Sequence, residues 1–551
     1  MRGLEAVKAL LPTRDDYDFR PSVVRVDVLA GVTVGVVALP LALAFGVSSG
    51  AGAAAGLVTA VVAGIVAAVF GGSPVQVSGP TGAMAVVLAP VVAAHGASSV
   101  ALVSIMGGVL VLLAGAARLG RLVGFLPWPV VEGFTLGIAC IIFLQQVPAA
   151  VGTTAAAGQN PFLAAVAAVA GAGSEVGWTV ATVAVVAVIM LVLPRLHRGL
   201  PASLVAVAVA TVAVELLHVP VPRIGALPSS IDATLPSFTP GTIGDLAGGA
   251  VAVAALAAIE SLLSARVAVA ITRGGPPVGP TRPDRELVGQ GLASIVSGLF
   301  GGMPATGAIA RTAVNVRSGA RTRLAAVVHA VVVLAVIYTA TGLVSRIPLA
   351  ALAGVLMVTS LRMAPVGTIR DVVRASRSSA VTFAVTAIVT VAADLILAVE
   401  IGLVVAAFFA LRTVARAAGA RREPLPGAAA AGDEHIALFR FEGAMFWGAS
   451  ERVLAGIADA AGDVRVVILR LSRLHLLDAT GARALGDTIE ELEASGVTVL
   501  VKGVQERHRH VLAATGALGR LGHEDHLFAN LDDAVAHARF HARAVPAPSP
   551  G

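Results

Sequence analysis

Two short stretches that interrupt long apolar regions have residue types suited to binding an anion. Residues 78–84 read Ser-Gly-Pro-Thr-Gly-Ala-Met, and residues 301–311 read Gly-Gly-Met-Pro-Ala-Thr-Gly-Ala-Ile-Ala-Arg. Each has a proline and then Thr-Gly-Ala, which can open a helix whose unpaired N–H groups attract negative charge. Glycine and proline can also mark simple kinks in membrane helices. Because the break recurs at matched positions in the two halves of the chain, we interpret the pair as one binding site.

Four residues of these stretches are candidates for direct contact with the ligand. Gly82 and Gly307 would let it approach the backbone closely, and Thr81 and Thr306 add hydroxyl donors. No Asp or Glu occurs between residues 27 and 132 or between residues 286 and 371, so both stretches lie in acid-free sequence. The ligand is therefore expected to carry negative charge.

Arg311 is a charged residue placed two turns into the second predicted half-helix. A charge within the membrane costs at least about 3 kcal/mol on insertion scales and marks a functional site by default. The alternative is that Arg311 extends to the cytoplasmic edge beside Arg317, as arginine near a helix end often does. We expect Arg311 to supply positive potential for the anion.

Glu260 is the other costly charge, in the middle of an apolar segment, with Ser264 one turn later on the same face. A buried carboxyl group can carry a proton, whereas a carboxyl group paired with a cation stays ionised. Glu260 is therefore either a coupling group, with Ser264 beside it, or the structural partner of a buried arginine.

Two further acids are interpreted as structural rather than ligand-binding. Glu132 begins an apolar segment near the cytoplasmic edge, where Arg118 or Arg121 could pair with it. Glu215 lies near His218 at a membrane surface, which suggests that these two residues form a pair.

The chain as a whole is too apolar to be a water-soluble enzyme. Of its 551 residues, 57% are hydrophobic and 13% are charged, and the mean hydropathy is +0.88. The net charge of +6 is modest, which argues against a nucleic-acid partner. Cys140 is the only cysteine, so an intramolecular disulfide and a cysteine-based zinc site are excluded. We find no nucleophile with its base and predict that the protein is not an enzyme.

Residues 27–416 contain fourteen apolar segments that could cross a bilayer, which takes about 20 helical residues for a core of about 30 Å. The segments are residues 28–45, 54–70, 75–94, 98–117, 128–147, 176–193, 201–218, 243–270, 286–300, 304–319, 322–342, 348–363, 378–394 and 396–415. Arginine-rich loops alternate with loops poor in arginine, which predicts that both termini are cytoplasmic, including an N-terminal segment of residues 1–26. The predicted fold is an α-helical polytopic membrane protein with fourteen transmembrane helices. Seven and seven form an inverted repeat, and each broken stretch is the third span of its half.

The C-terminal part has ordinary soluble polarity. Residues 417–433 read as a Pro/Ala/Gly linker, residues 434–542 as a small α/β domain, and residues 543–551 as a disordered tail. Strands are predicted at residues 435–441, 465–471 and 497–502, and helices at residues 449–461, 480–495, 505–515 and 530–540. His508, His510, His523 and His526 lack the spacing of a ligand template, so we predict surface residues and no metal site.

The membrane part resembles the sulfate permease (SulP) family of anion transporters, the solute carrier 26 group. The resemblance rests on residues 27–45 (DVLAGVTVGVVALPLALAF), 75–84 (VQVSGPTGAM), 257–264 (AAIESLLS), 289–323 (GQGLASIVSGLFGGMPATGAIARTAVNVRSGARTR) and 347–356 (IPLAALAGVL). It implies the inverted-repeat fold shared with uracil-permease-type carriers, in which a core domain (spans 1–4 and 8–11) moves against a gate domain (spans 5–7 and 12–14). In that family the anion lies between the third and tenth half-helices, beside the first and eighth spans.

Carried over position by position, the resemblance implies a set of pocket residues. They are Phe45, Thr81, Gly82, Ala83, Thr306, Gly307, Ala308 and Arg311. Two departures matter. Leu41 stands where some members have a polar residue, and Glu260 and Ser264 stand where sodium-coupled bicarbonate members carry Asp and Thr. We therefore favour proton coupling through Glu260 and Ser264 and leave Na⁺ open.

The C-terminal domain resembles the sulfate transporter and anti-sigma factor antagonist (STAS) domain. The residues that carry this likeness are 465–471 and the sequence Leu477-Asp478-Ala479-Thr480-Gly481 that follows. Soluble relatives have a phosphorylatable serine after this Asp, where the chain has Ala479. Thr480 could be a hydroxyl acceptor, but a helix N-cap is the favoured interpretation. The resemblance implies regulation, dimer assembly or a cytoplasmic partner.

These observations predict a secondary active transporter of inorganic anions, sulfate or bicarbonate, in the plasma (inner) membrane. We expect an elevator-type movement, proton coupling, a homodimer in contact with membrane lipid, and no cofactor. The alternatives are a dicarboxylate transporter of the same family and a membrane anion sensor that signals through the STAS domain. The sequence does not choose among these anions, because a backbone dipole site reads charge and size more than identity.

Overall fold

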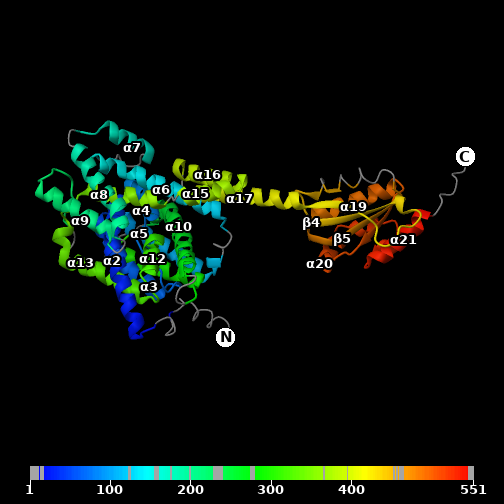
Figure 1. Ribbon diagram of the computed structural model, residues 1–551, viewed down its shortest axis with the longest axis horizontal. Helices are drawn as coiled ribbons and strands as arrows, with labels where there is room; N and C mark the ends of the chain where they lie inside the picture. The colour runs from blue at the N-terminus through cyan, green and yellow to red at the C-terminus, as the bar shows by residue number, and fades with distance from the viewer. Residues whose placement is uncertain are drawn as a thin grey trace. The chain divides into compact units, whose positions relative to one another are not determined.

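The computed structural model describes residues 12, 18–121, 126–153, 160–173, 176–197, 200–226, 240–272, 279–363, 366–393, 395–450, 453–454, 457 and 464–543. The chain forms two compact units, residues 1–403 and 404–551, which are described separately (Figure 1). The boundary falls within helix α17 (Leu395–Ala417). The predicted tail, residues 543–551, lies outside the described residues except for Arg543.

The first unit is helical, and its two halves have the same order of elements. The first half contains α2 (Pro21–Ser48), α3 (Ala53–Phe70), β1 (Ser78–Gly79), α4 (Gly82–His95), α5 (Ser99–Ala116), α6 (Trp128–Ala150), α7 (Pro161–Ala170), α8 (Val176–Leu196) and α9 (Ala202–Leu216). The second half contains α10 (Pro240–Thr272), α11 (Pro283–Leu299), β2 (Thr306–Gly307), α12 (Ile309–Arg317), α13 (Leu324–Val344), α14 (Leu349–Met363), α15 (Val366–Ala375), α16 (Arg377–Ala392) and α17. In each half a two-residue strand precedes the third helix, and the sixth helix has ten residues.

Helices of each half pack against equivalent helices of the other half. The fourth helix of each half packs against the first and second helices of the other half: α5 against α10 and α11, and α13 against α2 and α3. Each third helix packs against the first helix of the other half, α4 against α10 and α12 against α2. Strand β1 pairs with β2 in an antiparallel ladder, Ser78 opposite Gly307 and Gly79 opposite Thr306. This exchange is the signature of two halves related by a two-fold axis, so the predicted inverted repeat is confirmed.

The helices of this unit form two contact groups. One group contains α2 to α5 and α10 to α13, which pack on one another as described above. In the other group α6 packs against α14 and α16, and α8 packs against α9 and α14. The groups meet where α2 contacts α9 and α14 and where α4 contacts α6. These two groups are called the core group and the gate group below.

The third helix of each half is too short to cross a membrane. At 1.5 Å per residue, the 14 residues of α4 extend about 21 Å and the nine residues of α12 about 14 Å, against a hydrocarbon core of about 30 Å. Nine of the described helices are long and apolar enough to span a membrane. They are α2, α3, α5, α6, α8, α10, α13, α14 with its continuation into α15, and α17. The count of fourteen spans stays a prediction.

Some element boundaries differ from those predicted. Helix α2 begins at Pro21, inside the predicted N-terminal segment, because proline suits the first position of a helix. The second half-helix begins at Ile309 and not at Thr306, because Thr306 and Gly307 are extended as β2. Arg311 therefore lies in the first turn of α12, not two turns into it.

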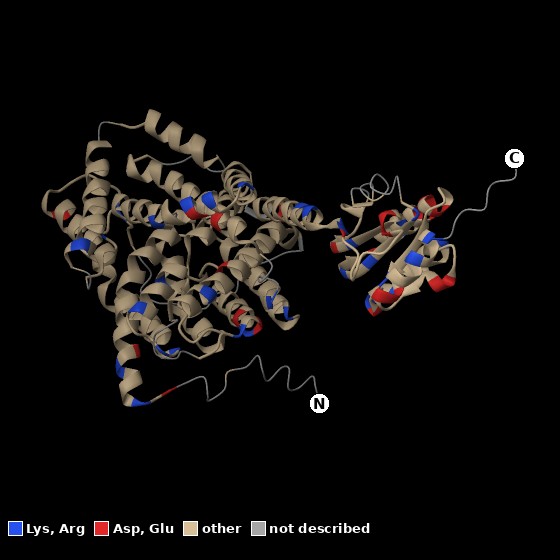
Figure 2. Ribbon diagram, turned by 45° about the vertical axis from the view of Figure 1, so that its right-hand side comes forward, with Lys and Arg blue, Asp and Glu red and all other residues tan. Residues whose placement is uncertain are grey.

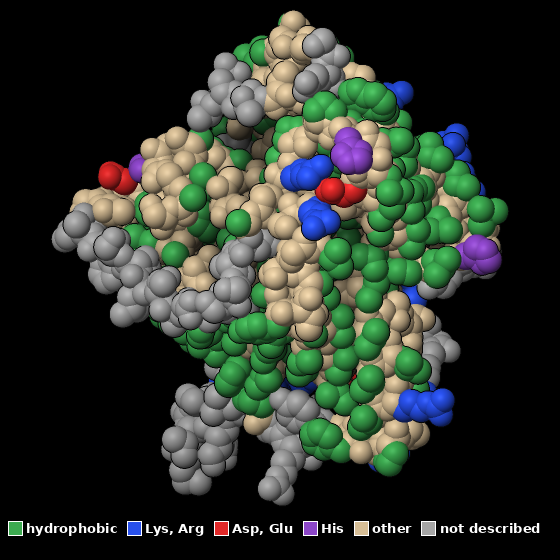
Figure 3. All heavy atoms as spheres, turned by 90° about the vertical axis from the view of Figure 1, so that its left-hand side faces the viewer, with side chains coloured by type: hydrophobic (Ala, Val, Ile, Leu, Met, Phe, Trp, Pro, Cys, Tyr) green, Lys and Arg blue, Asp and Glu red, His purple; other side chains and the backbone are tan. Residues whose placement is uncertain are grey.

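The outer surface of the first unit is largely apolar. Charged residues are sparse in its ribbon and frequent in the second unit (Figure 2). The face drawn in Figure 3 carries hydrophobic side chains with few charged ones among them. Leu216 on α9 and Leu343 on α13 are 73% and 70% exposed. Apolar surface of this extent marks contact with lipid in a multi-pass membrane protein.

The second unit contains a five-stranded sheet in the order β3-β4-β5-β6-β7, parallel except for the antiparallel β3–β4 pair. Its strands are β3 (Gly419–Glu423), β4 (Ile436–Met445), β5 (Val466–Leu477), β6 (Thr498–Lys502) and β7 (Leu527–Phe528). Its helices are α19 (Ala479–Ala494), α20 (Glu506–Ala514) and α21 (Leu531–Arg543), with short 3-10 turns η3 (Asp433–His435), η4 (Ala517–Arg520) and η5 (Glu524–His526). The predicted α/β domain is confirmed, although strand β3 occupies part of the predicted linker.

Three predictions about the second unit need correction or stay open. Asp478, and not Thr480, caps α19, because its carboxylate accepts a hydrogen bond from the N–H of Gly481 at 2.7 Å. His508 and His526 are 4% and 7% exposed, so they are buried residues and not the predicted surface residues. Most of the predicted helix at residues 449–461 lies outside the described residues.

Candidate functional site

The two half-helices start beside each other in the middle of the core group. Strands β1 and β2 pair, and the N–H of Ala308 extends the ladder by donating to the carbonyl of Val77 at 2.9 Å. Thr81 precedes α4 and Ala308 precedes α12, and neither helix end is capped by the side chain of that residue. The first N–H groups of both helices, including those of Gly82, Ala83 and Ile309, donate to no other described residue. Such groups carry partial positive charge at a helix start.

Glu260 on α10 joins the two helix starts. Its Oε2 accepts hydrogen bonds from the Thr81 hydroxyl at 2.9 Å and from the Thr306 hydroxyl at 2.8 Å. The two hydroxyl oxygens are 3.1 Å apart, so the three oxygens form a triangle. Residues from three elements far apart in sequence therefore meet at one carboxyl group. Of the two interpretations of Glu260, a structural ion pair with arginine is not observed, since its partners are threonines.

Arg311 is buried inside the core group, with only 2% of its surface exposed. Its Nη2 donates to the carbonyl of Pro80, and its Nη1 is buried without a hydrogen-bond partner. A β-carbon built on Gly79 would lie 2.7 Å from Nη1, so the guanidinium lies against the backbone of β1. The alternative that Arg311 extends to the cytoplasmic edge is therefore wrong.

Serines of α10 hold β2 and α12, the broken segment of the same half, in place. Ser261 accepts a hydrogen bond from the N–H of Gly307 at 3.0 Å, and Ser264 donates to Thr312 at 3.1 Å. Thr312 also accepts from the N–H of Val77 at 3.1 Å. Ser264 is therefore placed one layer behind the helix starts. Ser261 and Thr312 were not predicted, and their only sequence signal is that each directly follows a predicted site residue, Glu260 or Arg311.

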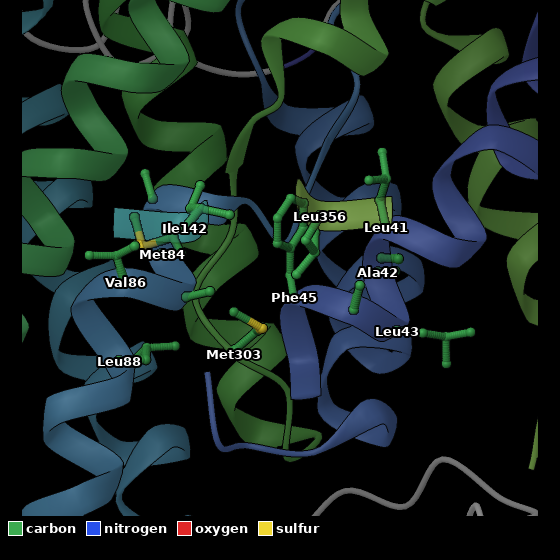
Figure 4. Close-up of a cluster of buried hydrophobic side chains, with 14 of the residues drawn as sticks. Leu41, Ala42, Leu43, Phe45, Met84, Val86, Leu88, Ile142, Met303 and Leu356 are labelled. Carbon is green, nitrogen blue, oxygen red and sulfur yellow. The ribbon is translucent and has the colours of Figure 1, made fainter. Parts of the chain in front are cut away.

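Phe45 closes one side of the helix starts with an apolar ring. It is 6% exposed, and Figure 4 shows it beside Leu356, with Met84 and Ile142 on one side and Leu41 on the other. A β-carbon on Gly82 would lie 2.3 Å from Cδ1 of Ile142 and 3.1 Å from Cε1 of Phe45. A larger residue at position 82 would therefore force the side chains of Ile142 on gate helix α6 and Phe45 on core helix α2 to move.

Gly307 is required for a different reason from the predicted one. A β-carbon there would lie 1.7 Å from Nε2 of Gln76, so the space is filled by the protein's own amide. Gln76 and Gln290 each donate to Oε1 of buried Glu286 at 2.8 Å, and Gln290 also donates to the Ser78 hydroxyl at 2.6 Å. This amide and carboxylate network supports β1 from behind. The network was not predicted, because it joins Gln76 and Ser78 to Glu286 and Gln290, which lie more than 200 residues further along the chain.

The two acids predicted to be structural have partners other than those expected. Glu132 accepts a hydrogen bond from Nε1 of Trp128 at 3.0 Å, one turn earlier on α6. Glu215 forms an ion pair with Arg223 at 3.0 Å. Neither acid forms a hydrogen bond or ion pair with Thr81, Glu260 or Thr306 in the described part of the chain, so the structural interpretation of both is kept.

The comparisons with known proteins agree with this geometry. A model described as the sulfate permease family matches residues 24–386, and a STAS domain model matches residues 428–534. The putative sulfate transporter YvdB of Bacillus subtilis is 32% identical over 516 residues, 92% of this chain and 96% of that protein. The bicarbonate transporter BicA of Picosynechococcus sp. is 31% identical over 505 residues, 85% of this chain and 86% of that protein.

Solved structures with the same fold include both a bacterial and a mammalian protein. The transmembrane domain of a cyanobacterium bicarbonate transporter BicA is 32% identical and superposes with a TM-score of 0.60 over 71% of this chain and 98% of that chain. The murine Slc26a9 anion transporter in the inward-facing state gives a TM-score of 0.82 at 15% identity over 97% and 94%, a likeness that concerns the fold alone. The family model covers well over half of the chain, and the chain therefore belongs to the sulfate permease family of sulfate and bicarbonate transporters and carries a STAS domain.

Proposed function

We propose that this chain is a secondary active transporter that carries sulfate or bicarbonate across the plasma membrane together with a proton. The observation that carries the proposal is the meeting of two uncapped helix starts beside the buried cation Arg311. The anion binds to the first N–H groups of α4 and α12, with Phe45 excluding water from one side. Of the predicted pocket residues, Phe45 and Thr81 to Ala83 border the start of α4 and Thr306 bonds to Glu260. The N–H groups of the predicted residues Gly307 and Ala308 already donate to Ser261 and Val77, so these two residues support the site from behind.

The charges around the helix starts support an anion rather than a cation. Each helix start is equivalent to roughly half a positive charge, and Arg311 adds a full one. Among the described residues, Glu260 is the carboxyl group bonded to both broken segments, and no ion pair between it and Arg311 is seen there. By this count the site carries a charge of about +1 with Glu260 ionised and about +2 with Glu260 protonated, so protonation raises its positive excess.

This charge balance couples the anion to a proton. An anion binds more tightly when Glu260 is protonated, and by linkage a bound anion makes that proton bind more tightly in turn. The triangle of oxygens supports the same proposal. The two threonine hydroxyls hold two protons, so all three edges of the triangle can be hydrogen bonds only when Glu260 carries a third proton.

We propose an elevator-type movement of the core group against the gate group. Both helix starts, Glu260 and Arg311 belong to the core group, so the site can move as one body with its hydrogen bonds intact. The main contacts between the two groups involve few helices: α2 packs against α9 and α14, and α4 packs against α6. We further propose cytoplasmic termini and a homodimer, for which the loop arginines and the STAS domain are the motivation.

Uptake into proteoliposomes tests the proposed function. Labelled sulfate, bicarbonate and fumarate would each be offered to purified full-length protein under an inward proton gradient or an inward sodium gradient. We expect accumulation of sulfate or bicarbonate above equilibrium under the proton gradient, abolished by a protonophore. Accumulation of fumarate alone would instead support the dicarboxylate alternative.

The same preparation separates a transporter from a sensor. Counterflow exchange of labelled anion needs a complete transport cycle but no gradient. If none of the three anions shows counterflow while the protein still binds one of them by calorimetry, the transport proposal is wrong and an anion sensor acting through the STAS domain is favoured.

A further inference from the structure

Three histidines of the second unit come together beside the end of the sheet. His526 ends the turn η5 before β7, and His537 and His541 lie one turn apart on the same face of α21. The ring centroid of His526 lies 5.4 Å from that of His537 and 5.4 Å from that of His541. The centroids of His537 and His541 are 4.8 Å apart. One ring nitrogen from each residue lies within 4.8 Å of those of the other two.

The spacing of these nitrogens suits a zinc ion. Zinc bonds histidine nitrogen at about 2.0–2.1 Å, so two ligands of a tetrahedral site are about 3.3 Å apart. The Nε2 atoms of His537 and His541 are 3.2 Å apart, which already matches this value. The ring nitrogen of His526 lies within 4.8 Å of both, so closing the site requires it to approach by about 1.5 Å or less.

A second observation points to a ligand at this place. His526 is 7% exposed, and its Nδ1 is buried without a hydrogen-bond partner. A buried polar atom without a partner is costly unless something else binds it.

We propose that His526, His537 and His541 form a binding site for Zn²⁺ in the STAS domain. Imidazole ligands select zinc, copper or nickel over magnesium and calcium, and three histidines with an open position are a familiar zinc ligand set. His523, whose ring centroid is 5.9 Å from that of His526, or a water molecule completes the coordination. The metal ion fastens α21 to the segment that leads into β7.

This site was not predicted from the sequence. His537 and His541 are separated by one helical turn, but His526 reaches them only because η5 folds against α21. The site is formed by residues of the second unit alone, and its proposal does not depend on which anion is transported.

Zinc titration of tag-free full-length protein tests the proposal. The protein in nanodiscs would compete for Zn²⁺ with a chromophoric chelator of known affinity. We expect one tightly bound Zn²⁺ per chain, and an affinity lowered by at least about 100-fold in His526→Ala, His537→Ala and His541→Ala, since even outer-shell changes cost 10–100-fold. His510→Ala, which changes an exposed histidine on α20, is the matched control and should leave the affinity unchanged.

X-ray absorption on the zinc-loaded wild-type protein gives a readout that needs no variant. We expect only nitrogen and oxygen ligands, with histidine scattering from three or four imidazoles and a bond length of about 2.0–2.1 Å. Sub-stoichiometric binding by the wild type, or an absorption spectrum with fewer than three imidazoles, would overturn the proposal. An equal loss of affinity in His510→Ala would do so as well.

Discussion

Replacing Arg311 by glutamine should weaken anion binding to a degree set by the charge of the anion. Arg311 does not need to touch the ligand for this effect. Its guanidinium lies against Gly79 of β1, and Thr81, two residues further on, marks the start of α4. Extended backbone covers about 3.3 Å per residue, so an anion at this helix start lies about 7 Å from the positive charge.

The expected loss follows from Coulomb's law. At about 7 Å and an effective dielectric constant of about 20, one positive and one negative unit charge interact by about 2.4 kcal/mol. Removing this interaction lowers the affinity for bicarbonate about 50-fold. Sulfate carries two negative charges, so its loss is about 4.7 kcal/mol, or about 2,500-fold.

The assay compares the two anions in one variant. Calorimetry on detergent-purified Arg311→Gln would measure the transported anion directly and the other one as its competitor. Arg311→Lys keeps the charge and should retain most of the affinity. Arg317→Gln removes an exposed arginine from the other end of α12 and is the matched control for a general change in surface charge.

Equal losses for both anions in Arg311→Gln would refute this reasoning. Such a result would mean that Arg311 acts mainly by bracing the carbonyl of Pro80. Unchanged binding would go further and remove Arg311 from the site.

Three further predictions address coupling, movement and the STAS domain. Glu260→Gln should abolish proton-driven accumulation in proteoliposomes yet spare counterflow, and proton-driven uptake that survives would remove the coupling role. The side chains of Ser48 on α2 and Gln146 on α6 are 3.0 Å apart. Ser48→Cys and Gln146→Cys in a Cys140→Ser background should be cross-linked by a short bifunctional reagent that forms disulfides with both thiols. This cross-link should stop transport until it is reduced. Transport by the cross-linked protein, with each single cysteine as control, would contradict movement of the core group against the gate group. Burial lowers the pKa of His508 from its ordinary value of 6.5, so the folded state binds a proton there less readily than the unfolded state. The free energy of unfolding of the STAS domain should therefore fall as the pH drops below about 6.5. Thermal unfolding of full-length His508→Gln should show a smaller loss over that range, and an identical loss would assign it to other groups.

Local sequence was enough to predict the half-helices. Pro80 with Thr81 and Gly82 marks a chain that cannot continue as a regular helix, and α4 begins where this signal ends. The acid-free surroundings and Arg311 then indicated the sign of the ligand. The alternation of strands and helices after residue 434 predicted the sheet of the STAS domain in the same way. These features depend on neighbours within one or two turns.

Pairings between distant residues could not be predicted. The start of α12 was placed at Thr306, because nothing nearby shows that Ser78 and Gly79 pair with Thr306 and Gly307. Glu260 was predicted either to carry a proton or to pair with an arginine. The threonine hydroxyls that bind it come from segments 179 and 46 residues away, which the sequence around Glu260 does not indicate. The prediction that the histidines are surface residues was wrong for His526 for the same reason, because its burial depends on how η5 lies against α21.

The antiparallel pairing of β1 with β2 has a consequence for biosynthesis. The backbone of Ser78 and Gly79 is ready to pair early, but Thr306 and Gly307 are added more than 220 residues later. At about 5–20 residues per second, the ribosome needs roughly 10 to 50 s for that interval. During this time the first broken segment must be kept from bare lipid by the translocation machinery or a membrane chaperone, because unpaired peptide groups are costly in hydrocarbon. Chains truncated before residue 306 should therefore remain bound to such factors and be degraded, while chains that include α12 are released.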